Sequence, residues 1–375
     1  MPAGKLRALG LPRMVLLAGA VASIVAAASA PRSASTAASQ VWPAFVLVIG
    51  LLLVGFAAAQ DGAFTGMAAA LDRLPGRPWL RYASSMALVA ATSVLLNLDT
   101  AVLFLTPVLV LLARRQEAGE QAFLYGCVFV ANSASLLLPG SNLTNLIVLQ
   151  RDHLAGTQFA ARLWPAWLVA VVVTAAVTAV LLRGHRGARA ETHRPPPHRP
   201  YLSSVAIAAV TVALLASPDP ALPVLAIGAG TTVALFAANR DARRRLTGAI
   251  DVTTVAGLFG LAVAAGTLGR TWLGPAHALA DAGRWGTAYT GAAAAVLLNN
   301  LPAAALLSAH PTAHPRALLL GLDIGPNIAV TGSLSAVLWW QAARLVNSPT
   351  SARRYSQIGV VVAMAAIPLA VLALP

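Results

Sequence analysis

Two apolar segments of the chain carry the same polar interruption, and this feature constrains the fold more than any other. Residues 95–105 read LLNLDTAVLFL and residues 297–307 read LLNNLPAAALL, so in both an asparagine follows two leucines. Polar breaks inside apolar segments, at corresponding places in two halves, indicate the binding site of a transporter. The rest of the chain should then form the membrane scaffold around these two breaks.

The composition is that of a polytopic membrane protein. The 375 residues are 58% hydrophobic and 10% charged, with a mean hydropathy of +0.74, whereas a soluble domain carries about 25% charged residues. The net charge of +14 does not indicate nucleic-acid binding, because the arginines form short clusters between apolar runs. There they set the topology and contact anionic lipid headgroups. The single cysteine, Cys127, allows neither an internal disulfide nor a CxxC metal site.

Uninterrupted apolar segments of about 20 residues predict simple membrane crossings. They cover residues 11–30, 41–59, 163–182, 201–216, 221–238, 252–268 and 357–374. The first of these ends in Ala28-Ser29-Ala30, which also resembles a signal-peptide cleavage site. We expect a retained helix there, because a later pair of helices matches the first pair.

Four further apolar segments are interrupted by polar or helix-breaking residues. Residues 83–113 are too long for one straight helix and carry basic residues at both ends, which predicts a re-entrant hairpin that opens to the cytoplasm. Residues 285–309, interrupted at 299–302, predict a second hairpin that opens outward. Residues 121–150 and 316–340 predict two broken helices.

The distribution of basic residues supports a topology of nine crossings and two hairpins, with the N-terminus in the cytoplasm. Only six of the 26 basic residues then lie outside, namely Arg32, Arg151, Arg162, Arg270, Arg284 and Arg316. Treating either hairpin as a simple crossing would remove this asymmetry. The fold class is therefore an all-α, multi-pass inverted-repeat transporter of the plasma (inner) membrane. Its parts are an N-terminal repeat (1–182), a basic, proline-rich cytoplasmic linker (183–200) and a C-terminal repeat (201–375).

The four breaks hold the candidate substrate- and ion-binding residues. Unwound backbone survives in a membrane only where protein or water satisfies it, and amide and hydroxyl side chains add neutral donors and acceptors beside it. The candidates are Asn97, Asp99, Thr100, Ser141, Asn142, Thr144, Asn145, Asn299, Asn300, Asn327, Thr331 and Ser333. Alternatively, such residues only join helices to one another.

Two carboxylates lie well inside apolar segments, Asp99 and Asp323. Placing one at the bilayer centre costs about 2.5–3.5 kcal/mol on insertion scales, so each is a candidate for proton coupling or Na⁺ binding. The alternative is a structural carboxylate at a half-helix N-terminus. Cys127 is interpreted as a packing residue rather than a thiolate ligand, and the histidines at 185, 193 and 198 as part of a solvated linker.

No nucleotide-binding P-loop and no catalytic motif such as HExxH or GxSxG occurs in the sequence. The chain is therefore predicted to be neither an enzyme nor an ATP-driven pump by itself. We expect no cofactor and no resident metal.

At its breaks the sequence resembles the arsenite permease family, within the ion transporter superfamily that also holds the sodium-coupled dicarboxylate carriers. The resemblance rests on LDTAVLFLTP at 98–107, ASLLLPGSNLTN at 134–145, NNLP at 299–302, GPN at 325–327 and TGSL at 331–334. It extends loosely from about residue 41 to the C-terminus. The first hairpin of the family usually reads Asn-Asp where this chain has Leu98-Asp99, with its asparagine one place earlier.

The resemblance implies proton-driven export of arsenite or antimonite through the hairpin tips and broken helices. The partners would be a small inorganic solute, a proton or Na⁺, and the lipid bilayer. The sequence leaves open whether a cytoplasmic ATPase subunit binds and whether the protein forms a homodimer. It also leaves two other functions open: a sodium-coupled anion or dicarboxylate carrier (or sodium/proton antiporter) on the same scaffold, and a non-transporting membrane subunit.

Overall fold

The computed structural model describes residues 3–73, 77–116, 118–149, 155–182, 201–217, 219–238, 242, 246 and 252–375. Throughout these residues the secondary structure is helical, with no strand. The first half contains α1 (Ala3–Ser29), α2 (Pro31–Gln60), α3 (Ala63–Asp72), α4 (Pro78–Leu96), α5 (Leu98–Arg115), α6 (Glu120–Ala134), η1 (Pro139–Ser141), α7 (Leu143–Leu149) and α8 (Gly156–Leu181). The second half contains α9 (Tyr201–Ala216), α10 (Ala221–Ala238), α12 (Val252–Thr271), α13 (Gly274–Ala280), α14 (Arg284–Leu298), α15 (Asn300–Leu307), α16 (Pro315–Ile324), η3 (Gly325–Ile328), η4 (Val330–Gly332), α17 (Leu334–Leu345) and α18 (Ala352–Leu372). The predicted all-α fold is confirmed.

Six helices in the described part are long and apolar enough to cross a membrane: α2, α4, α8, α10, α12 and α18. The shorter apolar stretches 13–29 and 202–216 fall in α1 and α9. Helix α2 begins ten residues before the expected segment 41–59, because its less apolar first turns are also helical. Helix α3, inside the polar stretch 60–82, was not predicted. The linker 183–200 and most of the basic loop after α10 lie outside the described residues.

Each predicted hairpin is a pair of helices separated by one asparagine. Helices α4 and α5 meet at Asn97, and α14 and α15 meet at Asn299. Helices α4 and α5 pack against each other, and Gln116, just after α5, donates to Asp72, the last residue of α3. Helix α13 packs on both arms of the second pair.

The two predicted broken helices are also broken in the structure, each by a 3₁₀ segment. Helix α6 ends at Ala134, and η1 separates it from α7. In the second half, η3 and η4 separate α16 from α17. Each break packs against the end of the first hairpin helix of its own half, η1 against α4 and both η3 and η4 against α14.

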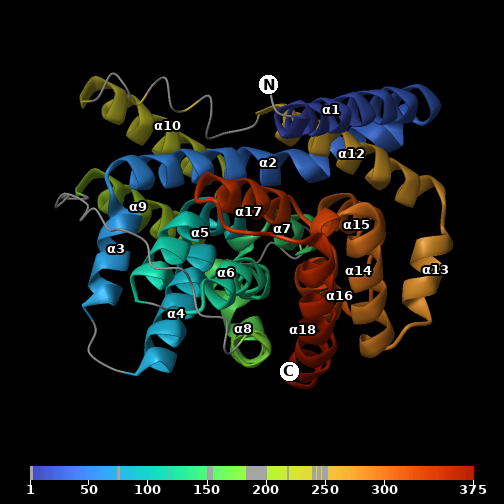
Figure 1. Ribbon diagram of the computed structural model, residues 1–375. Helices are drawn as coiled ribbons and strands as arrows, with labels where there is room; N and C mark the ends of the chain where they lie inside the picture. Colours follow the sequence, from blue (N-terminus) through green and yellow to red (C-terminus); the bar gives the residue numbers. More distant parts are fainter. Residues whose placement is uncertain are drawn as a thin grey trace.

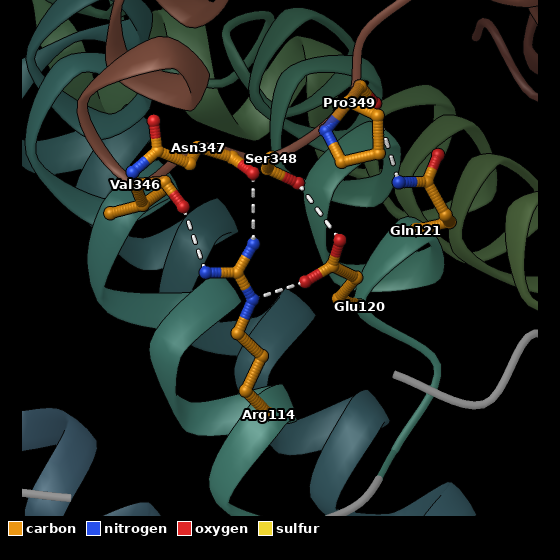
Figure 2. A network of polar contacts seen from close by, with 7 residues as sticks. All are labelled: Arg114, Glu120, Gln121, Val346, Asn347, Ser348 and Pro349. Atoms are coloured by element: carbon orange, nitrogen blue, oxygen red, sulfur yellow. Dashed lines mark hydrogen bonds and ion pairs between the residues drawn. The ribbon is translucent and has the colours of Figure 1, made fainter. Parts of the chain in front are cut away.

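The two hairpins open toward opposite ends of α18. At the start of α18, Arg114 of the first hairpin donates to the carbonyls of Val346 (2.8 Å) and Asn347 (3.4 Å) and forms an ion pair with Glu120 (Figure 2). At its other end, Leu374 lines a surface groove together with Arg284, where the second hairpin begins. The 21 residues of α18 span about 31 Å, close to the thickness of a bilayer core.

Helices α1, α2, α10 and α12 form a layer that runs across the top of Figure 1, above the hairpins. Glycines let these helices approach closely: a Cβ at Gly50 of α2 would lie 2.7 Å from backbone atoms of α10. The layer holds the second arm of each hairpin, since α2 packs on α5 and α12 packs on α15. The candidate site therefore lies on one side of this layer, among the hairpins and the broken helices.

Candidate functional site

The tip of the first hairpin is a single residue, Asn97, with φ 83° and ψ 161°. Its Oδ1 accepts a hydrogen bond from the Thr100 backbone N–H (3.0 Å), which caps α5. The side chain is fully buried, and no protein group in the described chain pairs with its Nδ2. Asn97 thus fixes the reversal of the chain and leaves one donor free.

Asp99 and Thr100 follow in the first turn of α5, and both are buried. Among the described residues, no hydrogen bond or ion pair engages the Asp99 carboxylate, and the Thr100 hydroxyl has no partner either. A Cβ on Gly55 of α2 would lie only 2.3 Å from the Thr100 methyl carbon. The glycine therefore lets this turn of α5 pack directly against α2.

The second tip repeats this arrangement without a carboxylate. Asn299 has φ 77° and ψ 146°, and its Oδ1 accepts from the Leu301 backbone N–H (3.3 Å). Its Nδ2 donates to the carbonyl of Thr331 (3.1 Å), which connects the tip to the second break. Asn300 is buried and makes no hydrogen bond with the described residues, whereas the Thr331 side chain is exposed.

Two side chains stabilise the first break. Asn145 donates from Nδ2 to the carbonyls of Ser135 (2.7 Å) and Leu138 (2.9 Å). Ser141 donates to the carbonyl of Val94 near the end of α4 (3.3 Å), so the first break also contacts the first hairpin. These bonds satisfy carbonyls that unwinding would otherwise leave without partners.

Asp323 joins the two halves of the molecule. Its Oδ1 accepts from Thr144 Oγ1 (2.5 Å) and from Asn142 Nδ2 (2.8 Å), both in the first half. Asn142 also donates to Ser135 Oγ (3.2 Å). The carboxylate is buried, and its Oδ2 has no hydrogen-bond partner in the described structure. The two carboxylates therefore differ, since Asp323 is held by two donors and Asp99 by none.

A second cross-half connection involves residues that the sequence did not single out. Asn132 of α6 donates to Asn327 Oδ1 (2.8 Å) and accepts from Ser335 Oγ (2.8 Å). Ser335 in turn lies 2.7 Å from Ser333 Oγ. Asn132 precedes the first break by a few residues, and Ser335 follows the second break. A polar residue in the apolar helix next to a break is the sequence signal that could have identified both.

The structure thus brings together most of the predicted residues, but in two groups. The broken helices contribute one buried network, whose two parts are joined by the hydrogen bond that Ser135 Oγ donates to the Asn132 carbonyl (2.7 Å). Its members are Asn132, Ser135, Asn142, Thr144, Asp323, Asn327, Ser333 and Ser335. The tip residues Asn97, Asp99 and Thr100 are not hydrogen-bonded to that network. Among the described residues, no lysine, arginine or histidine donates to it.

Several buried polar atoms at the breaks lack a partner in the part of the chain that the structure describes. They are Asn97 Nδ2, Thr100 Oγ1, Asn145 Oδ1, Asp323 Oδ2 and Asn327 Nδ2. A buried polar group without a hydrogen bond costs about 1–3 kcal/mol. The arrangement is suited to a small polar solute that supplies the missing donors and acceptors.

A family model described as citrate transporter (CitMHS) matches residues 10–340 of the chain. Among curated proteins, an arsenical pump membrane protein of Yersinia enterocolitica is 26% identical over 89% of this chain and 86% of its own length. One of Escherichia coli strain K12 is 26% identical over 95% and 92%. An uncharacterized transporter of Mycobacterium tuberculosis is 26% identical over 88% and 84%.

The fold has a counterpart among solved structures. The YdaH transporter of Alcanivorax borkumensis, described as having an unusual topology, superposes with a TM-score of 0.58. The alignment covers 100% of this chain and 98% of that one, at 14% sequence identity. This similarity concerns the fold alone.

Proposed function

The chain belongs to the citrate transporter family (CitMHS), a family of membrane transporters, and on that premise we propose that it exports arsenite or antimonite across the plasma membrane. Protons entering the cell drive the export, and the N-terminus is cytoplasmic. The observation that carries the substrate assignment is the buried network at the broken helices, whose donors and acceptors are hydroxyl, amide and carboxyl groups. The arsenical pump proteins that match most of the chain support it.

The network fits arsenite because neither the solute nor most of the network's side chains carry a charge. Arsenous acid is uncharged at pH 7 and offers hydroxyl groups, so it needs neutral hydrogen-bond partners and no fixed cation. Asn327 Nδ2 and Asp323 Oδ2, both unpaired among the described groups, are a donor and an acceptor in the network that such a solute can engage. Antimonous acid has the same arrangement of hydroxyl groups.

We assign proton coupling to Asp99. A buried carboxylate without a partner is costly in a membrane, so it requires a proton or a cation when no charged group neutralises it. Asp99 is only 3% exposed and lies two residues after Asn97 at the hairpin tip, next to Thr100 with its unpaired hydroxyl. Asp323 acts in substrate binding, because two donors from the opposite half already orient it.

Everted membrane vesicles test this function directly. With an imposed proton gradient they should accumulate arsenite, and Asp99→Asn should abolish the gradient-driven part of the uptake. Asp323→Asn should raise the arsenite concentration needed for half-maximal uptake, because it removes the charge but keeps an oxygen acceptor. Asp281→Asn is the matched control, since Asp281 is an exposed carboxylate after α13. Uptake that survives Asp99→Asn unchanged would refute the assigned role.

Membership of the citrate transporter family favours a second candidate, a sodium-coupled carrier of citrate or a dicarboxylate. A polyanion requires cationic side chains or several helix N-termini, and no basic side chain joins the described network. The same vesicles discriminate the two functions. Citrate uptake that requires Na⁺, without arsenite uptake, would establish the anion carrier, and neither activity would favour a non-transporting subunit.

A further inference from the structure

A cavity of about 210 Å³ lies beside the first break. Its walls come from the middle of α2, from α7 and the first turn of α8, and from the start of α10, and they include Pro139 and Asn145. Asp219 and Leu222 lie at its rim, where both are exposed. The volume is enough for several water molecules.

Asn145 connects this cavity to the candidate site. Its Nδ2 is used in stabilising the break, whereas its buried Oδ1 has no partner in the described structure. The residue is fully buried yet lines the cavity. It lies one residue after Thr144, which donates to Asp323. The short helix α7 therefore contacts Asp323 through Thr144 and lines the cavity through Asn145.

The opposite end of the same broken helix is closed. Helix α6 starts at Glu120, which forms the ion pair with Arg114 and accepts from Ser348 Oγ (3.3 Å) (Figure 2). Gln121 donates to the Pro349 carbonyl (3.3 Å), so the loop after α17 is fixed to the start of α6. The cavity and this polar network thus lie at the two ends of the first broken helix, α6–η1–α7.

We propose that this cavity is the outer vestibule of the transport path, which the solute enters after it leaves Asp323. The proposal rests on the function and orientation given above and adds the route of exit. The structure then corresponds to an outward-open state, with the path sealed on the cytoplasmic side by the network around Arg114. The mostly apolar wall lets a hydroxylated solute pass without trapping it.

The single native cysteine makes this route accessible to thiol chemistry. Cys127 is fully buried, so Cys127→Ser provides a background without reactive thiols. Leu146→Cys and Leu222→Cys then place a thiol inside the vestibule and at its rim. Val172→Cys, on an exposed apolar face of α8, and Ala313→Cys, in the exposed loop before α16, are the controls.

Intact cells are treated with a charged, membrane-impermeant methanethiosulfonate, and arsenite uptake is then measured in everted vesicles. We expect labelling of Leu146→Cys, Leu222→Cys and Ala313→Cys but not of Val172→Cys. Uptake should be lost on labelling of Leu146→Cys and retained on labelling of Ala313→Cys. Failure of both vestibule thiols to react from outside, or full uptake after they have reacted, would overturn the proposal.

A failure of the proposed function can be distinguished from a failure of the vestibule proposal. If vesicles with the unlabelled wild-type protein take up no arsenite, the substrate assignment is wrong. The labelling pattern alone then decides whether the cavity is open to outside water, because a charged reagent reaches a thiol only through water.

Discussion

Two asparagines occupy a backbone conformation that is almost restricted to glycine. Asn97 and Asn299 both combine φ near 80° with ψ near 150°, and a non-glycine residue held in this region stores about 1–3 kcal/mol. The same side chains compensate in part by capping the following helix through Oδ1. Because the strain and the cap occur at the tips of both hairpins, we propose that they belong to the transport site.

At the first tip, replacement of Asn97 separates strain from capping. Asn97→Ala keeps the strained backbone and loses the cap, whereas Asn97→Gly loses the cap but relieves the strain. We expect the glycine variant to be more stable than the alanine variant by about 1 kcal/mol or more. Thermal unfolding in one detergent measures the difference, and equal stability of the two variants would contradict this account.

At the scale of elements, α18 supports the second break through one glycine. A Cβ on Gly359 would lie only 1.6 Å from the Asn327 backbone oxygen, so α18 and η3 can be this close only because a side chain is absent. We expect Gly359→Ala to displace η3, lower thermal stability and abolish transport. The control is Gly230→Ala in α10, where a Cβ would meet nothing within 4 Å. It should be neutral or slightly stabilising, because alanine favours a helix.

The network in Figure 2 connects the first hairpin to the loop after α17. Arg114 and Glu120 are only 16% and 13% exposed, so their ion pair is partly shielded from water. A double-mutant cycle with Arg114→Ala and Glu120→Gln should give a coupling energy of about 1 kcal/mol. Arg114→Ala alone should cost more than Glu120→Gln alone, because Arg114 also donates to two carbonyls.

For this cycle the control is Arg353→Ala, an exposed arginine in the first turn of α18 at the same end of the molecule. It should leave stability unchanged. A coupling energy of zero between Arg114 and Glu120 would mean that the carbonyl contacts alone hold this end of the fold together.

At the scale of the whole molecule, the two halves contact each other reciprocally. Helix α5 of the first hairpin packs on α17 of the second broken helix, and α15 of the second hairpin packs on α7 of the first. The hairpins open toward opposite ends of α18. This exchange is what an inverted repeat produces, and we propose that the two halves are such repeats.

The orientation has a direct test. With a cytoplasmic N-terminus and nine crossings, the end of α18 lies outside. A periplasmic phosphatase reporter fused after Pro375 should be active, and a fluorescent protein fused there should be dark. The same reporters inserted into the loop 346–350, near Arg114, should give the opposite result. Activity of the phosphatase at both positions would exclude this topology.

The sequence by itself determined the helical membrane fold and the positions of its four breaks. An apolar segment in a membrane must form its backbone hydrogen bonds internally, which makes it helical. The breaks at Asn97, Pro139, Asn299 and Pro326 can be read from the sequence because a polar or helix-breaking residue interrupts an apolar run at each place. It also identified Asp99 and Asp323 as the two carboxylates inside apolar segments, because a charge there is costly wherever the helix packs.

Only the tertiary structure decided which of these residues act together. Asp323 accepts hydrogen bonds from Asn142 and Thr144, which lie about 180 positions away in the sequence. Asn132 belongs to the same network because it is hydrogen-bonded to Asn327 and Ser335. Sequence patterns record the period of a helix but not the neighbour it packs against. The sequence therefore could not distinguish the two carboxylates. Among the described residues, Asp323 is hydrogen-bonded and Asp99 is not, because the packing of the two halves places donors next to Asp323 alone.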